Sequence, residues 1–261
     1  MAPPLTAILR QRELILTLVA REMKTRYRGS VLGYFWSFLN PLLLLGVYTV
    51  VFSTIFQPRV AGVSPYALFL FVGLLPWTWF AGCLTECTTV FADNASLMKK
   101  VPFASEALPV VKVISHGLHF LLGLPVVLAA LALTGHLRWT ALLAVVPLLL
   151  QVLALAGLGL LVAASSVYFR DFKDLLTNLL HLLFFATPII YVLEMLPIPW
   201  MRTVIRLNPL THLFRLWQQT LFFGTLPSPG ALLASAVFAL VALALGLTAF
   251  AALRENLAER L

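Results

Sequence analysis

Charged residues are scarce in this chain: they make up 11% of its 261 residues, whereas soluble domains carry about 25%. Hydrophobic residues account for 61% of the sequence, and the mean hydropathy is +0.97. So little charge cannot cover the surface of a soluble domain, which excludes that class of protein. Because the apolar runs are long, the composition predicts an all-α membrane protein.

Signatures of nucleotide binding and hydrolysis are absent from the sequence. No Gly is followed by Lys, so there is no G-x-x-x-x-G-K-[ST] loop, and neither G-x-S-x-G nor H-E-x-x-H occurs. We therefore expect no catalytic residue in this chain. Asp171 and Asp174 have the D-x-x-D spacing with which intramembrane prenyltransferases hold Mg²⁺ on a diphosphate, but no second acidic cluster accompanies them. We prefer ion pairs with a partner, or with Arg170 and Lys173.

Cysteine and histidine patterns predict no metal site. The two cysteines, Cys83 and Cys87, are four residues apart on one predicted helix, where side-chain direction disfavours a disulfide and two thiols alone cannot complete a metal site. Among the five histidines only His116 and His119 have helical i,i+3 spacing, and no carboxylate lies near them in sequence. We expect all of these side chains to be polar or small packing groups.

Six apolar runs are long enough, at roughly 20 residues or more, to cross a bilayer as helices. They cover about residues 31–56, 66–90, 110–133, 139–166, 175–193 and 231–253. Small residues such as Gly157 and Gly159 in the fourth run would permit close contact between helix backbones. Residues 195–230 alternate apolar pieces with five prolines, which predicts re-entrant helices before the last span.

Basic residues predict how these spans are oriented. Of the 18 Lys and Arg residues, five fall on predicted outside loops, at Arg59, Arg138, Arg202, Arg206 and Arg215. The remaining 13 flank the other ends of the spans, which by the positive-inside rule places both termini in the cytoplasm. The net charge of +8 is therefore assigned to membrane anchoring and anionic lipids, and we expect no nucleic-acid partner.

Two segments precede and interrupt the spans on the cytoplasmic side. In residues 5–28 apolar and basic side chains recur with a helical period, which predicts an amphipathic helix in the membrane interface. Residues 1–30 are thus a cytoplasmic interface segment, and residues 31–261 form the transmembrane domain. The loop 91–109 carries both charge signs and has room for a short helix at Leu97–Val101.

Aromatic side chains and one carboxylate are the remaining candidates within the spans. The aromatic candidates are Tyr34, Trp36, Trp77, Trp79, Tyr191 and Trp217. They fit interfacial anchoring, and they also fit a path on which sugar rings stack without a fixed register. Glu86 lies near the inner end of the second predicted span. It could face a cavity or a partner in a functional role, or it could have a structural role, neutral or with its carboxylate reaching towards the membrane surface.

Five short motifs occur in order along this layout. They are L-V-A-R-E-M-K-T-R-Y-R-G-S-V-L-G-Y-F-W-S-F-L-N-P at 18–41, N-A-S-L-M-K-K-V-P-F at 94–103, Y-F-R-D-F at 168–172, T-P-I-I-Y at 187–191 and N-P-L at 208–210. With them the chain resembles the membrane subunit of ABC-2 type polysaccharide exporters, over nearly its whole length. No single motif is specific, but five in the right order make chance similarity improbable.

The resemblance implies partners, a cargo and a location. Two copies would form a channel in the bacterial inner membrane, above two copies of a separate subunit that binds ATP and Mg²⁺. The cargo would be an undecaprenyl-linked polysaccharide, such as O-antigen, capsule or teichoic acid. An ABC-2 type drug or lipid exporter is the alternative within the family, and an intramembrane prenyltransferase or glycosyltransferase is the alternative outside it.

The resemblance assigns one site, and the spacing of basic residues predicts a second. Within the loop 91–109, residues 94–103 would correspond to the coupling helix that receives the ATPase stroke, with docking residues Asn94, Leu97, Met98, Lys99, Lys100, Val101 and Phe103. A solvated cytoplasmic turn is the open alternative. The basic strip, defined as Arg21, Lys24, Arg26 and Arg28, would receive the lipid pyrophosphate at the inner surface. Arg21, Lys24 and Arg28 have the spacing of one helix face, and a turn is predicted after them at Gly29-Ser30. The planar guanidinium of an arginine can donate two parallel hydrogen bonds to the oxygens of a phosphate. Plain attraction to anionic lipid, about 1 kcal/mol per charge, is the open alternative.

Overall fold

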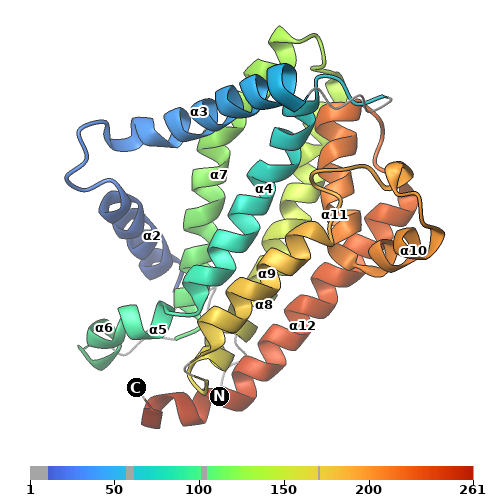
Figure 1. The fold of residues 1–261 in the computed structure, drawn as a ribbon. Helices are drawn as coiled ribbons and strands as arrows, with labels where there is room; N and C mark the ends of the chain where they lie inside the picture. The colour runs from blue at the N-terminus through green and yellow to red at the C-terminus, as the bar shows by residue number, and fades with distance from the viewer. Residues whose placement is uncertain (1–10, 57–61, 101–104, 170, 261) are drawn as a thin grey trace.

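The computed structural model describes residues 11–56, 62–100, 105–169 and 171–260, and the regular elements in these ranges are all helices (Figure 1). The longer ones are α2 (Arg12–Arg26), α3 (Trp36–Val50), α4 (Tyr66–Cys87), α7 (Ala107–Leu133), α8 (Val145–Ser166), α9 (Phe172–Phe185) and α12 (Pro229–Arg260). The shorter α-helices are α5 (Val90–Asp93), α6 (Ala95–Lys100), α10 (Pro199–Leu207) and α11 (Pro209–Trp217). The 3₁₀ segments are η1 (Gly33–Phe35), η3 (Trp139–Ala144) and η4 (Leu193–Met195), and the π segments are η2 (Val51–Phe56) and η5 (Gln218–Phe223).

Five helical stretches in the described ranges are long and apolar enough to cross a membrane. They are Gly33–Val50, Tyr66–Cys87, Ala107–Leu133, Trp139–Ser166 and Pro229–Ala252. The first, second, third, fourth and sixth predicted runs are therefore confirmed as helical, spanning candidates. The layout with six spans stays a prediction.

The fifth predicted run is shorter as a helix than its hydropathy indicated. We expected residues 175–193, but α9 has 14 residues and ends at Phe185. Pro188 disfavours helical backbone in the residue before it, Thr187. Asn208 binds the turn that follows α9: its Nδ2 donates to the backbone carbonyl of Ala186 at 3.0 Å and to the side-chain hydroxyl of Thr187 at 3.1 Å. Two of the sequence motifs thus meet in this turn.

Helices α8 and α12 pack backbone to backbone. A Cβ atom added to Gly157 would lie 2.2 Å from the carbonyl oxygen of Ala242, and one added to Gly246 would lie 2.1 Å from the carbonyl oxygen of Gly157. No real Cβ contact is that short, so these positions require glycine. The predicted close contact of small residues in the fourth run is confirmed at Gly157.

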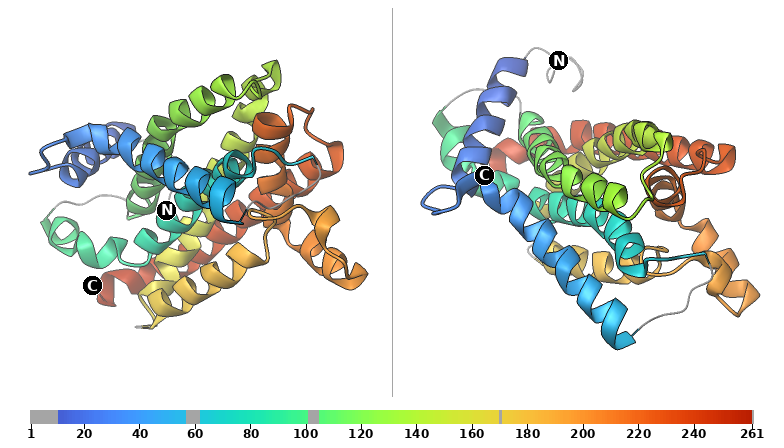
Figure 2. Two further views of the ribbon diagram at one scale, coloured as in Figure 1. Left: turned by 45° about the horizontal axis from the view of Figure 1, so that its top comes forward. Right: turned by 90° about the horizontal axis from the view of Figure 1, so that it is seen from above.

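The polar segments gather at one end of the bundle. In Figure 1, α5, α6 and the end of α12 lie at the bottom, α2 lies at the left above α6, and the turn between α7 and α8 lies at the top. Seen from above, α2 and α3 lie on one side of the bundle and α10 on the opposite side (Figure 2). We call the end at which α2, α5 and α6 lie the α2 end, and the opposite end the α7–α8 end.

Helix α2 is docked onto the bundle by its apolar face. Ile15, Leu18, Val19 and Met23, at helical spacing, are buried in a cluster formed with residues of α5, α7, α8 and α12. Arg21 and Lys24 lie on the exposed side of the same helix. One face is thus apolar and covered by protein, and the predicted contact of α2 with a membrane interface stays a prediction.

Candidate functional site

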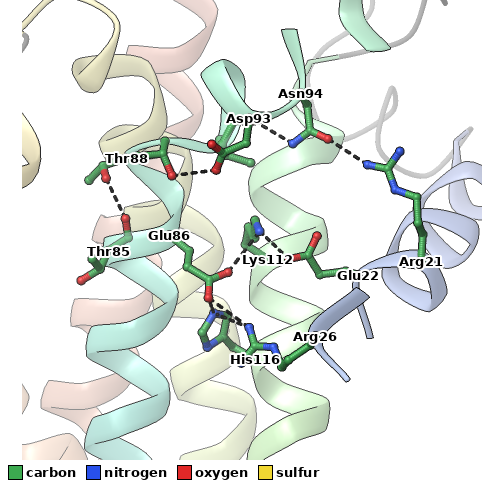
Figure 3. A network of polar contacts seen from close by, with 12 residues as sticks. Arg21, Glu22, Arg26, Thr85, Glu86, Thr88, Asp93, Asn94, Lys112 and His116 are labelled. Atoms are coloured by element: carbon green, nitrogen blue, oxygen red, sulfur yellow. Dashed lines mark hydrogen bonds and ion pairs between the residues drawn. The ribbon is translucent and has the colours of Figure 1, made fainter. Parts of the chain in front are cut away.

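Glu86, at the last turn of α4, is the centre of a charged network that joins three helices (Figure 3). Its Oε1 lies 3.0 Å from Nη2 of Arg26 on α2 and 3.1 Å from Nε2 of His116 on α7. Its Oε2 accepts a hydrogen bond of 3.1 Å from Nζ of Lys112, also on α7. The second carboxylate, Glu22 of α2, accepts from the same ammonium at 2.6 Å.

Burial makes this network a structural requirement. The side chain of Lys112 is only 9% exposed, whereas those of Glu22 and Glu86 are 26% and 38% exposed. An ammonium so far from water needs partners, because an unpaired buried charge is costly. Glu22 and Glu86 supply two, one from α2 and one from α4. The network therefore fixes α2 against α4 and α7.

A second polar contact links α2 to the short helices α5 and α6. Nη2 of Arg21 donates to Oδ1 of Asn94 at 2.9 Å, and Nδ2 of Asn94 donates to the carbonyl of Val90 at 2.9 Å (Figure 3). Asn94 stands between α5 and α6, at the start of the predicted docking segment. Helix α2 thus contacts both the charged network and the predicted docking loop.

Above the network lies a groove of about 600 Å³ between α3 on one side and α4 and α7 on the other. We call it the α3 groove. Its lining comprises Arg26, Asn40, Pro41, Leu43, Leu44, Val47, Phe71, Leu75, Thr78, Trp79, His116, His119 and Phe120. Its basic members, Arg26, His116 and His119, lie in or beside the network, and most of the remaining wall is apolar. The groove therefore has a polar head, formed by Arg26, His116 and His119 at the α2 end, and a mostly apolar body.

Tyr27 contacts His119, one of the residues at the head of the α3 groove. Its hydroxyl is hydrogen-bonded to Nδ1 of His119 at 2.8 Å and to the hydroxyl of Ser37, and its ring packs against Tyr34 with centroids 4.8 Å apart. The contacts join the end of α2 to the beginning of α3 and to α7. They fix the side chains that line the head of the groove.

The structure separates the four residues of the basic strip. Arg26 is in the network and lines the groove, Arg21 is bonded to Asn94, and Lys24 and Arg28 are exposed. Our expectation that Arg28 shares a helix face with Arg21 and Lys24 was wrong, because α2 ends at Arg26. The predicted turn is confirmed, since Gly29 has a φ of +77°. The role of the strip in phosphate binding stays a prediction.

The described part of the predicted docking segment is helical, and its two apolar residues there, Leu97 and Met98, are packed against other residues. Helix α6 begins at Ala95, two residues before the predicted helix. Leu97 and Met98 are half-buried against the cluster that holds α2, and Lys99 is exposed. Val101, Phe103 and the side chain of Lys100 lie outside the described residues. ATPase docking stays a prediction.

The aromatic candidates divide into buried and exposed groups. Trp217 is fully buried and donates from Nε1 to Oε1 of Gln151 at 2.9 Å, and Trp77 packs among Phe80, Phe184 and Phe214. Trp79 is buried too, yet its ring lines the α3 groove and stacks on Phe120. Tyr34, Trp36 and Tyr191 are more exposed, and the hydroxyl of Tyr191 donates to the carbonyl of Phe185 at 2.9 Å. A glycan path along these rings stays a prediction.

The sequence analysis overlooked Glu22 and Lys112. A signal existed for Lys112, because it falls inside the third predicted run, where a charge normally has a partner. We treated it as a flanking charge. His116 and His119 do lie side by side on α7, but their partners are Glu86, Arg26 and Tyr27. In the ranges described, no group of three or more His, Cys, Asp or Glu side chains is placed to hold a metal ion.

Comparison with known proteins gives a consistent family. A model of the family described as ABC-2 type transporter matches residues 13–222. An O-antigen export system permease protein RfbA of Myxococcus xanthus is 35% identical over 250 residues, which is 95% of both chains. A protein of the same name from Klebsiella pneumoniae is 32% identical over 82% of both chains. A polysialic acid transport protein KpsM of Escherichia coli is 25% identical over 92% of this chain and 93% of its own length.

Proposed function

Because the chain belongs to the family of ABC-2 type transporters, we propose that it is the membrane subunit of an exporter that moves a lipid-linked polysaccharide across the bacterial inner membrane. Full-length similarity to permeases named for O-antigen export and polysialic acid transport supports the substrate class. A drug or lipid exporter of the same family is the alternative that an experiment must exclude.

The α3 groove is the observation that carries the proposal within this chain. A polyprenyl or acyl tail needs an apolar channel open towards lipid, and a phosphate head needs cationic or N–H donors at one end of it. The whole groove has a volume of about 600 Å³, its body is mostly apolar, and it carries Arg26, His116 and His119 at its head. We assign the head to the phosphate of the lipid carrier and the body to the first part of its tail.

The charge at this head comes from more than one residue. Within the network the carboxylates of Glu22 and Glu86 balance the cations of Lys112 and Arg26. The excess positive charge that draws in an anion therefore comes from the rest of the basic strip, namely Arg21, Lys24 and Arg28. Arg26 contacts Glu86 and His116 through Nη2 alone, and a guanidinium has five N–H donors to offer. Arg26 can thus keep its network contacts and donate to a phosphate as well.

Energy for export would come from another subunit. The sequence has no phosphate-binding loop, so ATP and Mg²⁺ would be bound by an ABC ATP-binding partner docked at the α2 end, near α6. Two copies of this chain would form the channel with two copies of that partner. Six spans with both termini in the cytoplasm are the arrangement that we propose, in which α9 and the residues that follow it through the turn at Thr187–Pro188 make the fifth crossing together.

Deletion of the gene in its own bacterium tests the proposal. We expect surface polysaccharide to disappear and lipid-linked polysaccharide to accumulate inside the cell, and a plasmid copy should restore both. A matched plasmid copy with Gly157→Leu, which cannot pack α8 against α12, should fail to restore them. Unchanged surface polysaccharide, with altered sensitivity to drugs or detergents, would favour the alternative exporter.

A further inference from the structure

A second pocket, of about 340 Å³, lies towards the α7–α8 end, between the turn around η4 and the helical pair α11–η5. We call it the η4 pocket. Its lining is Pro188, Val192, Leu193, Glu194, Arg215, Gln218, Gln219, Phe223 and Thr225. The α7–α8 turn contacts η5 directly, since the hydroxyl of Thr140 donates to the carbonyl of Thr220 at 3.0 Å and the ring of His136 stacks on Phe222. The η4 pocket and the α3 groove share no lining residue.

Two amide side chains are held in place at the wall of the η4 pocket. Gln218 is 3% exposed, and its Nε2 donates to the carbonyl of Pro188 at 2.7 Å. Oε1 of Gln219 accepts from the backbone N–H of Ser228 at 3.1 Å, which orients its amide nitrogen. Each amide group carries two N–H donors and a carbonyl oxygen. The wall therefore presents planar hydrogen-bonding groups whose orientation is fixed before any ligand arrives.

The two charged side chains of the η4 pocket, Glu194 and Arg215, are not hydrogen-bonded to each other. Nη2 of Arg215 lies 3.8 Å from Oε1 of Glu194, beyond the range of a hydrogen bond, and the two side chains are 41% and 67% exposed. The turn that carries Glu194 is nevertheless fixed, because Arg202 donates to the carbonyls of Leu196 at 2.7 Å and Glu194 at 3.3 Å. A carboxylate and a guanidinium are thus positioned in the same pocket with most of their hydrogen-bonding capacity unused.

These groups select against most ligand classes. A single carboxylate among neutral and cationic neighbours is a poor cation site, and the same carboxylate repels a phosphate. The polar wall would leave buried groups unpaired against a wholly apolar ligand. A ligand rich in hydroxyls satisfies all of them, because each hydroxyl both donates and accepts, and planar carboxylate, amide and guanidinium groups can bond two adjacent hydroxyls at once.

We propose that the η4 pocket is a saccharide subsite for the polysaccharide chain as it leaves the protein. The proposal rests on the proposed function and adds where, and through which residues, the sugar is held. Glu194, Arg215, Gln218 and Gln219 bind hydroxyls, and the ring of Phe223 contacts the apolar face of a sugar ring. A volume of about 340 Å³ is at the small end of ligand sites, so the pocket holds a short segment of the chain. A partly open site of this kind binds weakly, which lets a polymer move on.

Cysteine labelling tests the subsite in the chain assembled with its ATPase in nanodiscs. Thr225→Cys places a thiol in the η4 pocket, and Thr203→Cys, on the exposed side of α10, is the matched control outside it. Cys83 and Cys87 are buried and give little background. A membrane-impermeant maleimide is the reagent. The probe is the bacterium's own polysaccharide freed from its lipid by mild acid hydrolysis, and polyethylene glycol of equal size serves as the crowding control.

The subsite predicts that the freed polysaccharide slows labelling of Thr225→Cys several-fold and leaves Thr203→Cys unchanged. Adding Glu194→Gln to Thr225→Cys should remove most of this protection. Equal labelling rates with and without polysaccharide, or equal protection by polyethylene glycol, would overturn the subsite. ATPase stimulation by the lipid-linked polysaccharide is measured in the same samples: if it persists, only the subsite has failed, and if it is absent, the proposed function has failed.

Discussion

Nη2 of Arg26 lies 3.0 Å from Oε1 of Glu86, although 60 residues separate them in the chain. The contact joins the end of α2 to the end of α4, and Lys112 and His116 of α7 bind the same carboxylate. Arg26 also lines the α3 groove. The residue that we assign to the phosphate head is therefore positioned by the network that fixes α2 on the bundle.

Lys112→Met should destabilise the protein, because it removes the ammonium that Glu22 and Glu86 share. Hydrogen bonds to charged groups contribute about 1.5–3 kcal/mol, and we expect a loss in that range in the free energy of unfolding. The measurement is the thermal unfolding midpoint of the purified chain in detergent. Lys173→Met is the matched control, since Lys173 is exposed on α9. Equal midpoints for the two variants would show that the network does not hold α2.

Gly157→Ala should lower the amount of folded protein in the membrane. Its new Cβ would collide with the backbone of α12 at Ala242, and overpacking of this kind costs about 1–3 kcal/mol or more. Gly230→Ala is the control, because a Cβ there has no heavy atom within 4 Å. Detergent-solubilised protein is followed by size-exclusion chromatography. If Gly157→Ala gives the same monodisperse yield as Gly230→Ala, then α8 and α12 do not pack as described.

Two substitutions on α6 should have different effects. Lys99 is exposed, so Lys99→Glu should weaken co-purification of the ATPase and leave the amount of the membrane subunit unchanged. Leu97 is half-buried against the α2 cluster, so Leu97→Ser should lower both. Co-purification from membranes at equal expression measures the two effects. Arg12→Glu, a charge reversal on the exposed start of α2, is the control for Lys99→Glu. ATPase binding that survives Lys99→Glu unchanged would remove α6 from the docking surface.

Arg28→Lys distinguishes phosphate recognition from attraction to anionic lipid. Arg28 is exposed and lies beyond the end of α2, so its replacement should not affect the network. If its guanidinium binds phosphate oxygens in a bidentate manner, then Arg28→Lys should reduce ATPase stimulation by the lipid-linked substrate. Arg26→Lys should reduce it as well, and should also lower the unfolding midpoint because a Lys cannot reproduce the guanidinium's contacts. Parent-level stimulation in both variants would leave the strip as an anchor only.

Local patterns in the sequence predicted the elements that local physics decides. Hydropathy alone indicated five stretches that the structure has as long helices, and Gly29 marked a turn that only a residue free to adopt a positive φ makes easily. Pro188 carried a local signal too, because it disfavours helix in the preceding residue. We extended the fifth run past it because the hydropathy continued, and the structure ends α9 before it.

Contacts between distant residues could not be predicted in the same way. Lys112 and Glu22 are 90 residues apart, and the sequence around each of them does not indicate the other as its partner. The i,i+3 spacing of His116 and His119 indicated one helix face but not Glu86 or Tyr27 as partners. As a tryptophan in a membrane protein, Trp217 fitted the prediction of an interfacial anchor, yet the helices around it bury its ring completely. Pairing and burial are set by the packing of helices, which a single sequence does not reveal.

We propose above all that this chain and an ABC ATPase together export lipid-linked polysaccharide. The most direct measurement is transport in proteoliposomes that contain both subunits, with lipid-linked polysaccharide supplied on the outer face and ATP added there. We predict that polysaccharide becomes protected inside the vesicles only when ATP, the ATPase and this chain are all present, and that the purified chain alone hydrolyses no ATP. Protection without the ATPase, or ATP hydrolysis by the chain alone, would contradict the claim.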